Sequence, residues 1–252
     1  MLILSRVLAM VEIAPLFSSR AIPQPAKIGF SFFVAIVVFP WVKDSGYSLP
    51  DTAVDYFLLV LGEVLVGILL GFFLQIIFAA FQVAGQFFSL QMGFGASQVF
   101  DPLAQIQIPL MGQFINIMAM FIFLTISGFK KLLLVGVLRS FQAIRAIDLV
   151  IGRDYLFSIL LKSLGGLFEN ALMIAFPVLG TLLLVSVTMG LLAKAAPQMN
   201  LLMLGFPIAI GTAFSVLILA MPFIVAAFVR IIEGGFENLA RILQALQQGG
   251  GI

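Results

Sequence analysis

The clearest helix of the sequence reads VDYFLLVLGEVLVGILLGFFLQIIFAAFQVA, from Val54 to Ala84. After Glu63, no charged residue follows until Asp101. A bilayer core about 30 Å thick needs roughly 20 apolar residues of helix, so this stretch is long enough to cross a membrane. Charges at the bilayer centre cost at least about 2.5 kcal/mol each on insertion scales and therefore collect at the ends of spans. The stretch predicts a membrane-embedded helix.

The composition extends this prediction to the whole chain. Of its 252 residues, 62% are hydrophobic and 10% are charged, whereas soluble chains are about 45–50% apolar and about 25% charged. Lipid or a large apolar partner surface must cover the excess. We therefore expect an all-α integral membrane protein, a single all-helical membrane domain over residues 1–252. Further charge-free intervals long enough to span a bilayer lie between Asp101 and Lys130, Glu169 and Lys194, and Lys194 and Arg230.

Prolines and polar residues divide the rest of the chain into further helices. A helix over 168–193 contains Pro177, which predicts a kink there. Residues 139–162 alternate apolar and charged types, which predicts a pair of interfacial helices joined by a loop at Gly152. The other expected elements are a short first helix within 2–17, apolar helices at 28–41, 110–127 and 201–229, a turn at 195–200, and an amphipathic helix after Arg230.

Gly67 and Gly71 lie one helical turn apart within the Val54–Ala84 helix. Two small residues at this spacing allow the backbones of two helices to approach closely. The pair predicts a packing notch within a helix hairpin, with a specific dimer seam as the alternative.

Residues 85–109 are too polar for lipid contact, yet Asp101 is their only charge. Non-helical backbone at membrane depth persists only where protein covers it or where it lines a cavity. The segment is therefore either an ordinary connecting loop or a loop that lines or blocks a pore. In the second reading the phenylalanines fill the pore, glutamines form reversible hydrogen bonds and glycines supply backbone freedom. The pore candidates are Gln91, Gly93, Phe94, Phe100, Asp101 and Pro102.

Residues that could support catalysis are scarce. The chain has no histidine and no cysteine, and its eleven acids are scattered, so we expect neither an enzyme nor a metal or other cofactor. Lys130-Lys131 is the longest basic run, which makes nucleic acid an improbable partner. Glu63 and Lys194 either mark helix ends at the membrane interface or serve a function. The spacing of Arg230 with Glu233, and of Glu237 with Arg241, predicts ion pairs on an exposed helix face.

Several motifs together resemble the FliR family of flagellar export-gate subunits. The most specific is GLLAKAAPQMN from Gly190 to Asn200, followed by Gly205-Phe-Pro207; its turn consists of Pro197, Gln198, Met199 and Asn200. The others are Gln91-Met-Gly93-Phe94 with Asp101-Pro102 and Pro109, Gly62-Glu63 with Gly67 and Gly71, and Arg6 with Pro15. The chain departs from the family in two respects: Phe129 stands where the family commonly has histidine, and the first helix is short.

The resemblance implies a non-catalytic subunit of the type III protein export gate, at the flagellar basal body in the bacterial inner membrane. Such subunits form kinked helical hairpins and assemble with FliP and FliQ into a helical channel for unfolded flagellar proteins, whose polar loop helps to plug it. It also implies contact with lipid and with an FlhB-like switch protein. The SctT subunit of injectisomes is related.

A small-molecule secondary transporter is the alternative function, because broken helices interrupted by glycine and proline also mark transporters. A transporter should carry acids or histidines for its coupling ions within its spans. The long charge-free intervals contain none, which favours the export gate.

Overall fold

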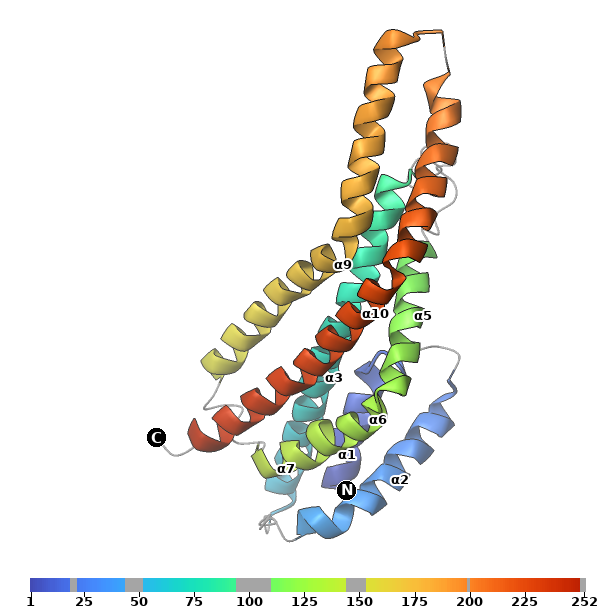
Figure 1. Ribbon diagram of the computed structural model, residues 1–252. Coiled ribbons are helices and arrows are strands. Elements are labelled where there is room, and N and C mark those ends of the chain that lie inside the picture. Colours follow the sequence, from blue (N-terminus) through green and yellow to red (C-terminus); the bar gives the residue numbers. More distant parts are fainter. Residues whose placement is uncertain (19–21, 44–51, 94–109, 144–152, 199, 250–252) are drawn as a thin grey trace. The chain divides into compact units, whose positions relative to one another are not determined.

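The computed structural model of the chain is built from helices and describes residues 1–18, 22–43, 52–93, 110–143, 153–198 and 200–249 (Figure 1). Within these residues no strand occurs, in agreement with the predicted all-α class. The helices are α1 (Leu2–Ile13), α2 (Gln24–Lys43), α3 (Ala53–Gln91), α5 (Leu110–Thr125), α6 (Gly128–Lys131), the π-helix η2 (Leu132–Arg139), α7 (Ser140–Ala143), α9 (Arg153–Ala195) and α10 (Leu201–Gly249).

The helices group into two compact units. Unit 1 combines residues 1–78, 123–165 and 232–252, and unit 2 combines residues 79–122 and 166–231. Unit 1 therefore holds α1, α2, the first part of α3 and the end of α10. Unit 2 holds the end of α3, most of α5, and the adjoining parts of α9 and α10.

Two predicted boundaries are wrong. Helix α3 continues to Gln91, so the first part of the 85–109 segment is helical, because its glutamines and serine do not break a helix as proline would. Helix α9 begins at Arg153 and runs without a break to Ala195, so residues 153–162 belong to the long apolar helix and form no separate interfacial element. The predicted turn between α9 and α10 is confirmed.

The helix after Arg230 is continuous with the apolar run before it, since α10 extends over 49 residues. Its predicted amphipathic character is confirmed by a buried stripe. Ile231, Phe236, Leu239 and Leu243 are all buried, while Glu237 and Arg241 are exposed and lie 3.6 Å apart. Glu233 pairs instead with Lys131, Oε1 to Nζ, at 2.7 Å.

A sharp bend separates α5 from α6. The chain turns by 75° between the α5 helix and the helical segment from Gly128 to Ala143, with Ser127 in the left-handed region at φ 57°. Gly128 is required next to it, since an added methyl group would overlap the ring of Phe123. The sequence predicted that the helix ends here. In the structure a second helical segment, Gly128–Ala143, follows directly after the bend, so that the two segments form a bent pair.

The described residues include four helices long and apolar enough to cross a membrane, or five if the bent pair counts as one span. They are α2 and α3, residues 158–195 of α9 and residues 203–245 of α10. In the most apolar window of α3, 61% of residues are buried within the chain, whereas the corresponding shares in α9 and α10 are 22% and 28%. Apolar surface on α9 and α10 is thus left for lipid or for another protein.

Candidate functional site

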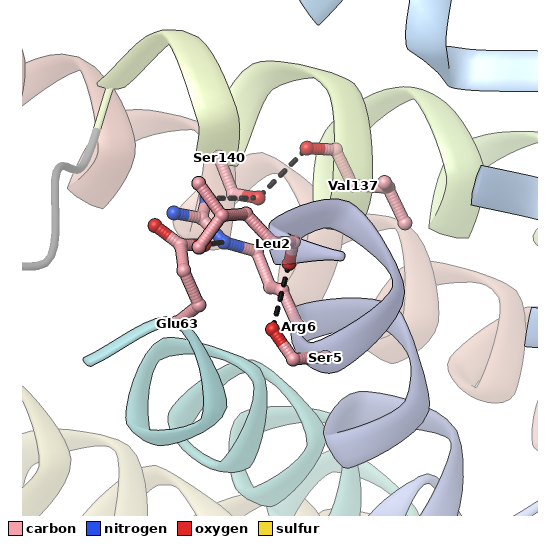
Figure 2. A network of polar contacts seen from close by, with 6 residues as sticks. All are labelled: Leu2, Ser5, Arg6, Glu63, Val137 and Ser140. Atoms are coloured by element: carbon pink, nitrogen blue, oxygen red, sulfur yellow. Dashed lines mark hydrogen bonds and ion pairs between the residues drawn. The ribbon is translucent and has the colours of Figure 1, made fainter. Parts of the chain in front are cut away.

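Arg6 of α1 and Glu63 of α3 form an ion pair buried inside unit 1 (Figure 2). Arg6 Nε lies 2.6 Å from Glu63 Oε2, and the two side chains are 1% and 0% exposed. A charge without a partner is costly to bury, so burial of either group requires the other. The pair joins α1 to α3 through two residues that are 57 positions apart in the sequence.

The same arginine also holds a third element, the helical segment that follows the bend. Arg6 Nη1 donates a hydrogen bond to Ser140 Oγ at 3.2 Å, and Ser140 Oγ donates to the carbonyl oxygen of Val137 at 2.7 Å. The Arg6 guanidinium lies over the ring of Phe141, 3.7 Å from its centroid, a cation–π contact. Figure 2 shows Glu63 and Ser140 beside Arg6, each from a different helix, with Val137 next to Ser140.

The two charges that the sequence singled out within apolar runs, Glu63 and Lys194, have different surroundings in the structure. Glu63 lies inside α3 and is fully buried, so it does not mark a helix end at an interface. The sequence contained a signal for its partner, because Arg6 is the one basic residue in the first apolar run of residues 2–17, but it did not indicate that the two meet. Lys194 is exposed in the last turn of α9, at a helix end.

Gly67 and Gly71 face α1. A methyl group added at Gly67 would overlap the backbone carbonyl oxygen of Arg6 and lie 2.9 Å from Ala9 Cβ. At Gly71 it would lie 2.9 Å from both the Met10 carbonyl oxygen and Ile13 Cβ. These distances are too short for carbon atoms, so only glycine permits α1 to lie this close to α3. The close approach brings Arg6 to Glu63, which precedes Gly67 by one turn.

Gly85 makes a similar contact in unit 2 that the sequence did not predict. A methyl group there would come within 2.5 Å of the Met111 carbonyl oxygen and of Gly112 Cα. Helices α3 and α5 therefore meet backbone to backbone at a pair of glycines. Gly85 and Gly112 are far apart in the sequence, so no local spacing indicates that they meet.

The pore candidates fall mostly outside the described residues, namely Phe94, Phe100, Asp101 and Pro102. Gln91 is the exposed last residue of α3. Gly93 follows in a turn with φ 86°, a left-handed conformation that glycine adopts at little cost. A methyl group at Gly93 would also overlap the ring of Phe206 in α10. Two independent features thus require glycine at this position.

The motif residues at the α9–α10 turn are surface residues. Pro197, Gln198 and Asn200 are exposed, and Met199 lies outside the described residues. Asn200 caps α10, because its Oδ1 accepts a hydrogen bond from the Met203 amide at 3.3 Å, as asparagine commonly does at a helix N-terminus.

Although Gly235 of α10 faces Ile77, several glycines of α9 and α10 have no such neighbours. Methyl groups added at these glycines would meet nothing within 4 Å. Large apolar side chains of the same two helices are exposed, with Phe176 at 75% and Phe223 at 78%. The α9–α10 hairpin therefore presents both bulky and small residues outward. Its open glycines are Gly180, Gly190, Gly205 and Gly211.

No arrangement for metal chemistry is seen in the described part of the chain, where no three His, Cys, Asp or Glu side chains come together. The buried Arg6–Glu63 pair is a structural contact between two groups of opposite charge. What the arrangement provides is a set of tightly joined helices in unit 1 and an uncovered helix hairpin in unit 2.

Comparison with known proteins gives a consistent result. Residues 1–235 match the family described as bacterial export proteins, family 1. The flagellar biosynthetic protein FliR of Bacillus subtilis is 34% identical over 248 residues, covering 96% of this chain and 93% of its own length. FliR of Escherichia coli K12 is 32% identical, with 96% and 92% covered, and FliR of Pectobacterium carotovorum is 32% identical, with 96% and 91% covered.

Proposed function

This chain belongs to family 1 of the bacterial export proteins, and from that membership we propose that it is a non-catalytic subunit of the type III protein export gate in the bacterial inner membrane. Its flagellar relatives give it a role in flagellar protein export. In the proposal it forms a channel with FliP and FliQ at the flagellar basal body, contacts an FlhB-like switch protein, and passes unfolded flagellar proteins.

The uncovered α9–α10 hairpin is the observation that supports assembly with other subunits. Lipid can cover bulky side chains such as Phe176 and Phe223, but it gains little from an open glycine. Small residues are enriched where membrane helices pack on each other, because they allow close approach. Gly190, Gly205 and Gly211 therefore favour partner helices on this hairpin.

The buried ion pair argues against the alternative of a small-molecule transporter. Coupling ions need an acid that can bind and release them within a span. Glu63 is the buried acid among the described residues, and its carboxylate is held by Arg6 at 2.6 Å. Its charge is thus committed to a structural contact.

Assembly is tested by expressing the chain alone and together with FliP and FliQ. We expect the lone chain to be heterogeneous in detergent and the co-expressed chain to elute as one monodisperse complex. Gly211→Leu should weaken the complex, since its side chain fills an open notch, and Gly29→Leu is a matched control at an open glycine of α2. A lone chain that is monodisperse and gains nothing from either partner would contradict the proposal.

We also propose that residues 91–109 obstruct the closed channel. The supporting features are a polar sequence with a single charge and the left-handed Gly93 at its start. Deleting residues 95–100 should leave the complex assembled but leaky to small ions, because the deletion removes none of the described helices. Conductance across a membrane that contains the gate measures this leak. An intact complex with the leak of the undeleted gate would return the segment to an ordinary connection.

A further inference from the structure

Helix α2 has two different sides. One stripe of the helix is buried, with Lys27, Ser31, Val34, Val38 and Val42, and α2 contacts α1 and η2. The remaining circumference carries large apolar side chains that are exposed in the part of the chain that the structure describes. This outward face of α2 consists of Phe32, Phe33, Ile36, Val37, Phe39 and Trp41, each at least half exposed.

The charges of α2 lie at its two ends. Near the first turn, Lys27 Nζ is 3.0 Å from Glu12 Oε2, and Lys43 is the last residue of the helix. No charged residue lies between them. A helix rises about 1.5 Å per residue, so the 20 residues of α2 extend about 30 Å, which matches the hydrocarbon thickness of a bilayer.

Trp41 stands beside Lys43 at one end of this face. Tryptophan is enriched where acyl chains meet headgroups, and a nearby lysine extends its ammonium group to the same boundary. Trp41 is 59% exposed, so its ring is available to the surroundings of the chain. The end of α2 thus has the composition of a membrane interface.

The outward face of α2 lacks what a partner helix would need. Helices that pack in membranes use small residues for close approach and polar residues for hydrogen bonds. The one serine in this part of the helix, Ser31, belongs to the buried stripe, and the outward face is aromatic and branched aliphatic. Helix α2 has one open glycine, Gly29 near its start, whereas the α9–α10 hairpin has several, together with exposed Ser186 and Thr188.

From these observations we propose that the outward face of α2 binds lipid acyl chains, with Trp41 at the boundary between acyl chains and headgroups. The proposal goes beyond the role in export, because it assigns to lipid a surface that a gate subunit could equally offer to protein. It rests on the proposed function only where it concerns the assembled complex.

The fluorescence of Trp41 reports on this face directly, because the chain contains one tryptophan. The full chain is reconstituted in bilayers of phosphatidylcholine brominated either near the headgroup or near the end of the acyl chain. We expect both lipids to quench Trp41, with the larger loss of fluorescence for bromine near the headgroup. Absence of quenching, or stronger quenching by the deep bromine, would overturn the proposal.

A matched variant separates lipid from protein contact. Trp41→Phe combined with Phe223→Trp moves the single tryptophan to the exposed face of α10. Both chains are labelled with 5-hydroxytryptophan, which can be excited apart from partner tryptophans, and are measured before and after FliP and FliQ are added. We expect the brominated lipids to quench Trp41 both before and after the partners are added. The tryptophan at position 223 should be quenched less once the partners are present.

The outcomes distinguish the two proposals. Protection of both positions on addition of partners would overturn the lipid proposal and leave the export-gate proposal standing. Protection of neither would contradict the export-gate proposal, and the depth-dependent quenching of Trp41 in the chain alone would then decide the lipid proposal.

Discussion

Three glycines of α3 and several of the α9–α10 hairpin occupy similarly apolar helices but have opposite surroundings. At Gly67, Gly71 and Gly85, the backbone or side chains of another helix lie so close that no methyl group fits. At Gly190 and Gly211, nothing lies within 4 Å. Another helix of the same chain fills the space beside the first set of glycines. The space beside the second set is open to another molecule. Glycine in a membrane helix thus indicates close packing without indicating which helix fills the notch.

The largest expected loss of stability comes from breaking the Arg6–Glu63 ion pair, which the close approach of α1 and α3 at Gly67 and Gly71 makes possible. Glu63→Ala leaves the Arg6 guanidinium buried with its main charge partner removed, which typically costs about 3–5 kcal/mol. We expect the lone chain to unfold at much lower SDS fractions in mixed micelles. The double variant Arg6→Met with Glu63→Leu is the control, since replacing both charges by apolar groups is often neutral. If Glu63→Ala is as stable as the unaltered chain, the pair does not join α1 to α3.

A smaller loss is expected at the filled notch itself. Gly67→Ala places a methyl group against the Arg6 carbonyl oxygen, and such overpacking costs about 1–3 kcal/mol. Mixed-micelle unfolding again measures the change. Gly29→Ala, at an open glycine of α2, controls for the altered helix propensity. Equal stability of the two variants would show that α1 can move away from α3 without cost.

Gly93 differs from the other closely packed glycines, because both its backbone conformation and the nearby Phe206 ring require glycine at this position. An L-residue in the left-handed region costs about 1–2 kcal/mol, so we expect Gly93→Ala to lose more than that amount, because the added methyl group also meets the Phe206 ring. Adding Phe206→Leu should remove the contact with the ring and leave the conformational part. Full recovery in the double variant would mean that the ring alone excludes a side chain at this position.

The smallest effect on the lone chain, and of opposite sign, is expected at an open notch. Gly211→Ala should stabilise the chain by up to about 0.5–1 kcal/mol, because alanine favours helix and the methyl group meets nothing. In the complex with FliP and FliQ the same variant should assemble less well, which analytical size exclusion measures. A loss of stability in the lone chain would indicate that a segment of the chain itself already covers Gly211.

The export-gate resemblance and the membrane class were readable from the sequence, for physical reasons. Charge-free intervals must be embedded, and motif residues such as Pro197 and Asn200 sit in a turn whose local chemistry fixes them. The end of α3 was misplaced because glutamine and serine are compatible with helix and with loop alike. Phe94, Phe100, Asp101 and Pro102 lie outside the described residues, so their role stays a prediction.

What the sequence determined alone is therefore the environment of the chain: its length of uncharged helix, its lack of histidine and cysteine, and glycines spaced for close contact. The tertiary structure decided which of these groups meet. Arg6 and Glu63 are 57 positions apart, and Gly85 pairs with Gly112 in another helix. Helical periodicity carries information only within one helix, whereas contact between helices depends on how whole surfaces fit. Only the folded chain could separate filled notches from open ones.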